Sequence, residues 1–283
     1  MLILEDITLK YKTMKKSFTI LLLFLFSLNV YSQEQRAYES CTYVNNVSVS
    51  EIPRFIELYK QFTDMSLGDN RTQSSEWLFR HWYGSGHTFV IYRAYDSMED
   101  YHADTDLADA NITAKIKAVA DADQQKILMD EWAELASFWD DHTDEIRVRN
   151  ASTGFYAKED ADFDSPFVMS VGRYNSSGSW GDMGNGFFNW VTVPDVDNDV
   201  SLAGGVSYHY MGSGPDLEVW NCYSSLVDFA TAVTAKKELS DTAKEGRKTF
   251  WSLADGGHED QIYLHIGHVN MEKGVFDLAG ADR

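Results

Sequence analysis

Cysteine and basic residues are scarce in this chain of 283 residues. Two cysteines, Cys41 and Cys222, are too few for a disulfide scaffold. Whether they form a single disulfide with each other is left open, because sequence spacing does not decide whether two thiols meet. Lys and Arg number 24 against 44 Asp and Glu, for a net charge of -20, and no basic cluster is visible. The composition therefore argues against a nucleic-acid partner or an anionic membrane surface, which both need excess positive charge.

Long apolar runs are also missing, except near the N-terminus. Residues 18–28 are apolar with two exceptions, follow two lysines and precede small residues at Val30 and Ser32. This pattern is typical of a secretory signal peptide, and we expect cleavage near Ser32 and export to the periplasm or the cell exterior. A membrane-anchored N-terminus is the alternative. Residues 1–13 precede a better start at Met14, and we assign them no structural role.

Removing residues 1–32 takes away four lysines and two acidic residues, so the net charge of the mature chain moves from -20 to -22. No later segment approaches the ~20 consecutive apolar residues that a membrane-spanning helix needs. We therefore expect no membrane span in the mature chain.

The chain matches itself at an offset of 128 residues. Residues 81–103 share seven identities with residues 209–231, including a His at the start and the Gly-Ser-Gly that follows it. A second block repeats further along, where residues 142–146 read HTDEI and residues 258–262 read HEDQI. Two blocks in the same order indicate an internal duplication. We predict a first repeat at 38–153, an acidic linker at 154–166, a second repeat at 167–270 and a C-terminal tail at 271–283.

The first repeat reads as strands and helices in a fixed order. Aromatic and branched residues predict strands at 41–44, 77–83, 88–95 and 145–150, with a hairpin at the Gly-Ser-Gly. Apolar residues at helical spacing predict helices that begin after Ser50 and after Ser97, which we expect to act as N-caps, and a further helix at about 124–139. The order β-α-β-β-α-β with an extra helix is that of a ferredoxin-like unit.

The second repeat departs from this order in its first helix. Residues 175–190 contain four glycines, which favour a loop or a strained short helix. The spacing of these glycines suggests phosphate binding, but the Lys-Ser/Thr that completes a phosphate loop is absent, so the loop interpretation is preferred.

The segment FVIYRAYDSMEDYH at residues 89–102 resembles the strand-to-helix segment of the dimeric α/β-barrel superfamily. This superfamily includes antibiotic-biosynthesis-monooxygenase-like and NIPSNAP-like domains. The resemblance implies an α+β fold in which two ferredoxin-like units place their four-stranded sheets face to face as a pseudo-twofold barrel. Here both units would lie in one chain. Members include oxygenases and haem-handling enzymes as well as proteins of no known chemistry, so the fold does not carry a function across.

Strand alternation predicts which side chains lie between the two sheets. Phe89, Ile91 and Val148 suit the face that packs on helices, which leaves the intervening positions for the interior. We predict an aromatic and polar lining that can bind a small apolar or aromatic ligand. Its members are His81, Tyr92, Arg147, Arg149, His209, Glu218, Trp220, Tyr263 and His265. The alternative is that these groups satisfy one another in a wet interface, and a register error of one residue would exchange the faces.

The repeated histidines have structural explanations. His81 and His209 precede glycine-rich turns and suit hydrogen bonding within a hairpin, whereas His142 and His258 follow helices and suit capping. No haem-attachment motif, EF-hand or nucleophile elbow is present, so no motif requires a cofactor and no metal site is predicted. The aspartates at 160–164 and 195–199 alternate as an EF-hand loop begins, but they lack its glycine and glutamate.

Two functions remain open. The first is a binding or stress-related module that holds a small ligand between the sheets. The second is a cofactor-independent monooxygenase or a haem-handling enzyme, which only the resemblance supports. Whether the protein is an enzyme, and which ligand it takes, cannot be decided from the residues.

Overall fold

Eight antiparallel strands close into a barrel in the computed structural model, which describes residues 36–84, 86–235 and 238–280. The strands of the ring are β1 (Arg36–Val44), β2 (Ser75–Tyr83), β3 (Phe89–Tyr95), β4 (His142–Asn150), β6 (Val168–Ser176), β7 (Ala203–Met211), β8 (Leu217–Tyr223) and β9 (Ala254–Asn270). Their order around the ring is β9-β2-β3-β1-β4-β7-β8-β6, and β6 pairs with β9 to close it. The signal peptide predicted at 1–32 lies outside the described residues.

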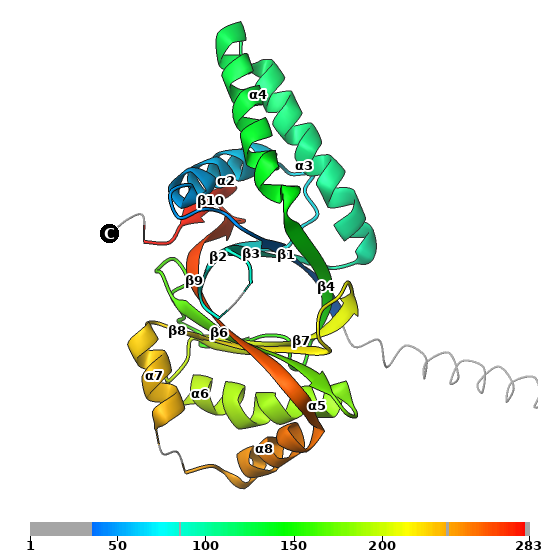
Figure 1. Ribbon diagram of the computed structural model, residues 1–283, viewed down its shortest axis with the longest axis vertical. Coiled ribbons are helices and arrows are strands. Elements are labelled where there is room, and N and C mark those ends of the chain that lie inside the picture. The colour runs from blue at the N-terminus through cyan, green and yellow to red at the C-terminus, as the bar shows by residue number, and fades with distance from the viewer. Residues whose placement is uncertain (1–35, 85, 236–237, 281–283) are drawn as a thin grey trace, which may run out of the picture. The chain divides into compact units, whose positions relative to one another are not determined.

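Helices cover the barrel on two opposite sides (Figure 1). One side carries α2 (Ile52–Ser66), α3 (Met98–Ala118), α4 (Ala122–Ser137) and a 3-10 turn at Phe138–Asp140. The other carries α5 (Trp180–Phe187), a π turn at Phe188–Thr192, α6 (Val193–Asp197), α7 (Leu226–Thr234) and α8 (Asp241–Leu253). Among the helices of the described ranges, none combines the length and the apolar character needed to cross a bilayer.

Two short strands lie outside the ring. β5 (Tyr156–Ala157) falls in the segment predicted as a linker and pairs with β7. β10 (Val275–Leu278) falls in the segment predicted as a tail and pairs with β9. Phe276 of β10 is fully buried and packs against Tyr59 of α2, with 5.4 Å between the two ring centroids. The last described residues are therefore part of the folded unit.

The predicted α+β class and barrel are confirmed, but the two four-stranded halves are not separate sheets that face each other. Their edges are hydrogen-bonded: β2 pairs with β9, and β4 pairs with β7. Backbone groups on an open edge would need other partners, and closing the ring satisfies them. One continuous interior follows, with its side chains supplied by all eight strands.

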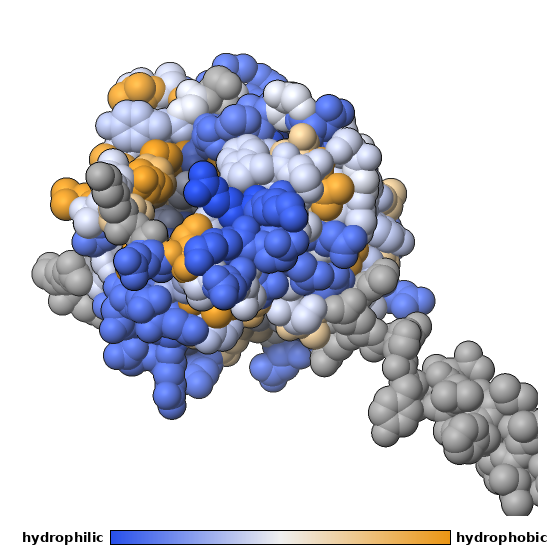
Figure 2. Space-filling view, turned by 90° about the horizontal axis from the view of Figure 1, so that it is seen from below, coloured by the Kyte–Doolittle hydropathy of each residue, from blue (hydrophilic) through white to orange (hydrophobic). Residues whose placement is uncertain are grey.

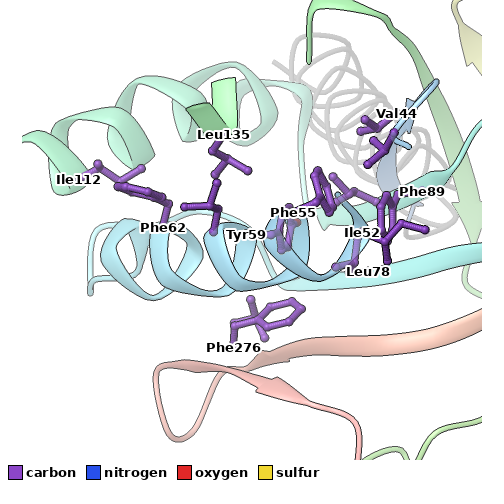
Figure 3. Packing of buried hydrophobic residues seen from close by; sticks show 14 of the residues in the cluster. Val44, Ile52, Phe55, Tyr59, Phe62, Leu78, Phe89, Ile112, Leu135 and Phe276 are labelled. Atoms are coloured by element: carbon purple, nitrogen blue, oxygen red, sulfur yellow. The ribbon is translucent and has the colours of Figure 1, made fainter. Parts of the chain in front are cut away.

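Strand alternation sorts the side chains into an outer and an inner layer. On β3, Phe89 and Ile91 point outward and join the cluster under α2, whereas Val90 and Tyr92 join the cluster inside the barrel. The outer cluster centres on Phe55 of α2, whose ring stacks on Phe89 at 4.2 Å (Figure 3). The predicted assignment of these faces is confirmed on this strand.

The two serines expected to cap helices behave differently. Ser97 lies in extended conformation before α3 and accepts a hydrogen bond from the backbone N–H of Asp100 at 3.0 Å. The Ser50 cap is wrong, because α2 starts one residue later than that cap requires and Glu51 at its N-cap position makes no side-chain cap hydrogen bond. Ser50 instead contacts the Ser48 hydroxyl at 3.1 Å.

We expect Ser97→Ala to lower the free energy of unfolding by about 1 kcal/mol, because it leaves an N–H of the first helical turn without its acceptor. Ser50→Ala is the matched control, and we expect it to stay within about 0.5 kcal/mol of the parent protein. Urea unfolding of both variants measures the difference. Equal losses in the two variants would show that Ser97 does not act as a cap.

Of the two alternatives for the glycine-rich segment at 175–190, a loop or a short helix, the structure shows the short helix over most of its length, since α5 and part of the π turn occupy it. Its glycines allow close packing. A Cβ on Gly184 would come within 2.2 Å of the Tyr208 hydroxyl, and one on Gly186 within 2.8 Å of the Gly246 carbonyl oxygen on α8. The face that carries α5, α7 and α8 is mostly hydrophilic, with separate hydrophobic patches (Figure 2).

Candidate functional site

A cavity of about 80 Å³ lies inside the barrel at the end where β1 and β6 begin. Its walls are mostly apolar, and three charged side chains reach it. The lining residues are Glu39, Trp77, Phe79, Tyr92, Arg149, Phe155, Phe163, Phe167, Met169, Ala203, Glu218, Trp220 and Cys222. Such a mixture of aromatic walls and a few polar groups is typical of a small-molecule site.

The aromatic side chains of the cavity contact one another, and around Trp77 two of the contacts are edge to face. Trp77 of β2 lies 5.7 Å from Phe163 and 6.2 Å from Phe167, both with nearly perpendicular rings. On the opposite wall Phe155 lies 6.0 Å from Trp220. Phe155 is 54% exposed, so it forms the rim of the cavity rather than its floor.

Glu39 of β1 and Arg149 of β4 form an ion pair at the cavity, with 3.4 Å between Oε2 and Nε. Their side chains are 10% and 19% exposed. Burial raises the pKa of Glu39 above its ordinary value, the guanidinium of Arg149 opposes the rise, Glu218 adds to it and Arg147 opposes it. Burial is the largest of these causes, so the protonated form of Glu39 is favoured more than in water.

Glu218 of β8 connects the cavity to a polar network deeper in the barrel. It accepts a hydrogen bond from the Tyr92 hydroxyl at 3.0 Å and lies 3.5 Å from Nε of Arg173. Arg173 in turn pairs with Glu145. A buried network of this kind is stable only when its charges and hydrogen bonds are matched.

Arg147 is the most deeply buried cation of this network, with a side chain that is 0% exposed. Its Nε donates to the Ser207 hydroxyl at 2.9 Å, and its terminal nitrogens donate to Glu145 and to the Pro215 carbonyl oxygen at 3.3 Å. The interior charges then balance. Three carboxylates, Glu39, Glu145 and Glu218, face three guanidiniums, Arg147, Arg149 and Arg173.

The structure distributes the nine predicted site residues over the height of the barrel. Tyr92, Arg149, Glu218 and Trp220 line the cavity. Arg147 and Tyr263 face the interior below it, and the ring of His265 stacks on Phe167 at 4.4 Å behind the cavity wall. His81 and His209 do not reach the cavity, because both lie near the β-hairpins at the other end. Their membership of a ligand site stays a prediction.

Three of the four repeated histidines, His81, His142 and His209, bond to the backbone. His81 Nε2 lies 2.9 Å from the Tyr83 carbonyl oxygen, and His209 Nε2 lies 3.2 Å from that of Gly212. The glycines that follow them, Gly84 and Gly212, have φ of +123° and +105°, which other residues rarely adopt. Hairpin geometry therefore explains why His and Gly recur together. In the second repeated block, His142 bonds to the Trp139 carbonyl oxygen at the end of the 3-10 turn, as expected for a capping residue. His258 lies within β9 and pairs with Asp260 at 3.0 Å, so the cap expected there is wrong.

Several lining residues were not predicted from the sequence. Phe155 and Phe163 come from the segment between the halves, where no strand periodicity marks a side chain as inward. Glu39 precedes the strand predicted at 41–44, and the observed β1 begins five residues earlier than predicted. Extending the alternation of Cys41 and Tyr43 backward by one step would have placed Glu39 on the interior face.

Cys41 and Cys222 are both free and buried, so they form no bridge. Burial also suppresses protonation of imidazoles inside the barrel: it lowers the pKa of His265 to about 3, with His268 adding to the effect. Within the described residues no group of three His, Cys, Asp or Glu side chains could hold a metal ion.

No family model and no curated protein matches the chain. Its fold is similar to a proposed monooxygenase from Fusobacterium nucleatum subsp. nucleatum, with a TM-score of 0.54, 9% identity, and 88% of this chain and 99% of that chain covered. It is also similar to an anthrone oxidase-like protein, with a TM-score of 0.51, 9% identity, and 88% and 98% covered. Both likenesses are to barrels of the dimeric α/β type, which the sequence also predicted for this chain. At these identities the likeness shows the fold alone.

Proposed function

We propose that the protein binds a small, uncharged, planar aromatic molecule in the barrel cavity. The observation that carries this proposal is the cavity itself, with rings on opposite walls and balanced charges beside it. Edge-to-face and stacked contacts between aromatic rings stabilise such a ligand by about 0.5–1.5 kcal/mol each beyond the burial of its surface. A net charge on the ligand would disturb the interior balance of three carboxylates and three guanidiniums.

The size of the cavity limits how deeply the ligand enters. At about 80 Å³ it is smaller than the ~150 Å³ cavity known to hold benzene in another protein. A ligand of one or two rings would therefore place one edge among Trp77, Phe79 and Tyr92 and leave the rest against Phe155 and Trp220 at the rim. A haem group is far larger than this space, and we derive no step through one.

We further propose that the two halves of the barrel are tandem ferredoxin-like repeats of an exported protein. The order of strands and helices in 36–150 recurs in 168–270, apart from the 3-10 turn of the first half and the π turn and α6 of the second. Equivalent strands carry different inward residues: Trp77 corresponds to Gly205, and Arg149 to His265. A single asymmetric site, rather than two, follows from these differences.

Filling the cavity tests the binding proposal. Ala203 lines the cavity and is fully buried, so Ala203→Leu would place three further carbon atoms in it. We expect this variant to weaken binding of 2-naphthalenemethanol at least 100-fold, measured by quenching of tryptophan fluorescence, since Trp77 and Trp220 adjoin the ligand. Ala230→Leu makes the same change on the exposed surface of α7 and should bind as the parent does. Unchanged affinity in a folded Ala203→Leu would place the ligand elsewhere.

A second candidate function is cofactor-independent oxidation of an anthrone-type ketone, in which dioxygen converts the ring CH2 into a carbonyl group with one oxygen atom and releases the other as water. It is favoured by the pair of Tyr92 and Glu218, a hydroxyl and a carboxylate that meet at the cavity wall, where the carboxylate can take a proton from the ring CH2 of such a ketone. The likeness to an anthrone oxidase-like protein suggests anthrone as the substrate to test. Oxygen consumption with anthrone, reduced at least 100-fold in Glu218→Gln, would support it. Tight binding of anthrone without oxygen consumption would leave the binding function alone.

A further inference from the structure

We infer that the same cavity also accepts aromatic carboxylates, and that it binds each of them together with one proton, which Glu39 takes up as the ligand replaces it beside Arg149. This inference rests on the proposed function, because it names a second ligand class for the same site. Proton uptake makes the affinity for these anions depend on pH, whereas the affinity for neutral aromatic ligands does not depend on it.

The geometry places an exchangeable ion pair at the cavity wall. Glu39 and Arg149 both line the cavity, and 3.4 Å separates the Glu39 carboxylate from Nε of Arg149. Charge-assisted hydrogen bonds are typically ~2.7–2.9 Å long, so this contact is a loose one. A guanidinium has five N–H donors, and Glu39 is the carboxylate paired with Arg149 in the part of the chain that the structure describes. Donors of Arg149 therefore remain for a ligand carboxylate.

The charges around Glu39 explain why a proton must accompany an anion. Arg149 and Arg147 face Glu39 from β4, Glu218 faces it from β8, and the buried Cys41 thiol follows it on β1. A ligand carboxylate beside Arg149 would add a fourth negative charge to an interior that holds three of each sign. Neutralising Glu39 restores the balance, and Glu39 is the carboxylate that the incoming group would displace.

The direction of the pH dependence follows from the same groups. The pKa of Glu39 is already raised by burial, and Arg149 is a cause that lowers it. A bound anion that engages Arg149 removes that effect and raises the pKa further, so the complex holds more protons than the free protein. Affinity for a permanent anion must then rise as pH falls, by up to about tenfold per pH unit between the two pKa values of Glu39.

Three probes that share one ring system separate the effect of ligand charge on affinity from the effect of the ring. These are 2-naphthalenemethanol, which is neutral, 2-naphthoate, and 2-naphthalenesulfonate, which stays ionised at every pH used. We expect the affinity for the alcohol to be constant between pH 5 and 8, and that for the sulfonate to rise at least tenfold as pH falls over this range. Calorimetry in buffers of different ionisation enthalpy should detect proton uptake with the two anions only.

Variants of the pair assign the proton. Glu39→Gln should bind the sulfonate with an affinity that no longer depends on pH, and at pH 8 at least tenfold more tightly than the parent protein. Arg149→Met should lose at least tenfold affinity for both anions while the alcohol still binds. Glu272→Gln removes an exposed carboxylate far along the chain and should keep the parental pH profile.

The two proposals fail in different ways. If the alcohol binds and the anions bind without proton uptake, or if Glu39→Gln keeps the parental pH profile, this inference is overturned and the proposed function stands. If none of the probes binds, the proposed function itself fails.

Discussion

Replacing Arg147 with methionine should lower the free energy of unfolding by about 3–5 kcal/mol at pH 8, because the substitution removes one partner of a buried ion pair. Arg147 is 0% exposed and Glu145 is 4% exposed, so water cannot replace the lost donor. The Ser207 hydroxyl and the Pro215 carbonyl oxygen also lose hydrogen-bond partners. Three interior carboxylates would then face two guanidiniums.

The effect of Arg147→Met should shrink at low pH. Arg147 lowers the pKa of Glu39, so its removal raises that pKa further. A carboxyl group whose pKa is higher in the folded than in the unfolded state binds more protons when folded, and its folded state gains stability as pH falls. Urea unfolding at pH 5 and pH 8 should therefore show a smaller loss at pH 5.

Two controls separate the charge of Arg147 from its packing. Arg149→Met removes a guanidinium that is 19% exposed and makes a 3.4 Å contact with one carboxylate, so we expect a smaller loss, of about 1–2 kcal/mol. The double variant Glu145→Gln/Arg147→Met restores the balance of charges and should recover more than 1 kcal/mol relative to Arg147→Met. A loss below 1 kcal/mol in Arg147→Met would contradict a structural role for the interior network.

Periodicity predicted the inward faces of the strands well. Alternate residues of a strand pack either under the helices or inside the barrel, and these two surroundings select different side chains. Val90 and Tyr92 lie inside the barrel, and Phe89 and Ile91 lie under α2, as the alternation indicated. The same rule placed Glu218 and Trp220 at the cavity. Alternation is a local property of the chain, so residues on regular strands could be assigned without knowledge of the barrel.

The rest of the cavity wall depends on contacts between distant segments. Phe163 reaches Trp77 from an irregular segment 86 positions further along, and no pattern within that segment announces its direction. His81 and His209 show a further limit of alternation, which assigns a face of the strand and not a height in the barrel. They belong to the strands that line the barrel, yet they lie beyond the cavity because strand length, rather than face, sets their height in the barrel.

Local helix rules left a loop and a short helix open for residues 175–190, and tertiary packing decided between them. The glycines at 184 and 186 lower helix propensity by roughly 1 kcal/mol each relative to alanine. They are nevertheless helical, because the approach of Tyr208 and of α8 leaves no room for a Cβ at these positions. The sequence shows the low helix propensity of glycine, but it does not show the close packing that glycine allows.

The closed ring of strands predicts how the protein unfolds, and one substitution in each helical layer tests it. Phe55 on α2 is 0% exposed and Phe250 on α8 is 1% exposed. Each packs among several rings: Phe55 lies 5.3 Å from Phe138, and Phe250 lies 5.0 Å from Tyr174. Replacing a buried phenylalanine with alanine typically costs about 3–5 kcal/mol, because a cavity remains.

We expect Phe55→Ala and Phe250→Ala each to shift a single unfolding transition, with the same midpoint by far-UV circular dichroism and by tryptophan fluorescence. Two facing sheets held by side chains alone could separate, so each substitution would destabilise only its own half. Here the β2–β9 and β4–β7 ladders join the halves through backbone hydrogen bonds. Neither half can therefore unfold without breaking both of these ladders. Coincident transitions in both variants indicate one cooperative unit, whereas a second transition confined to one half would contradict it.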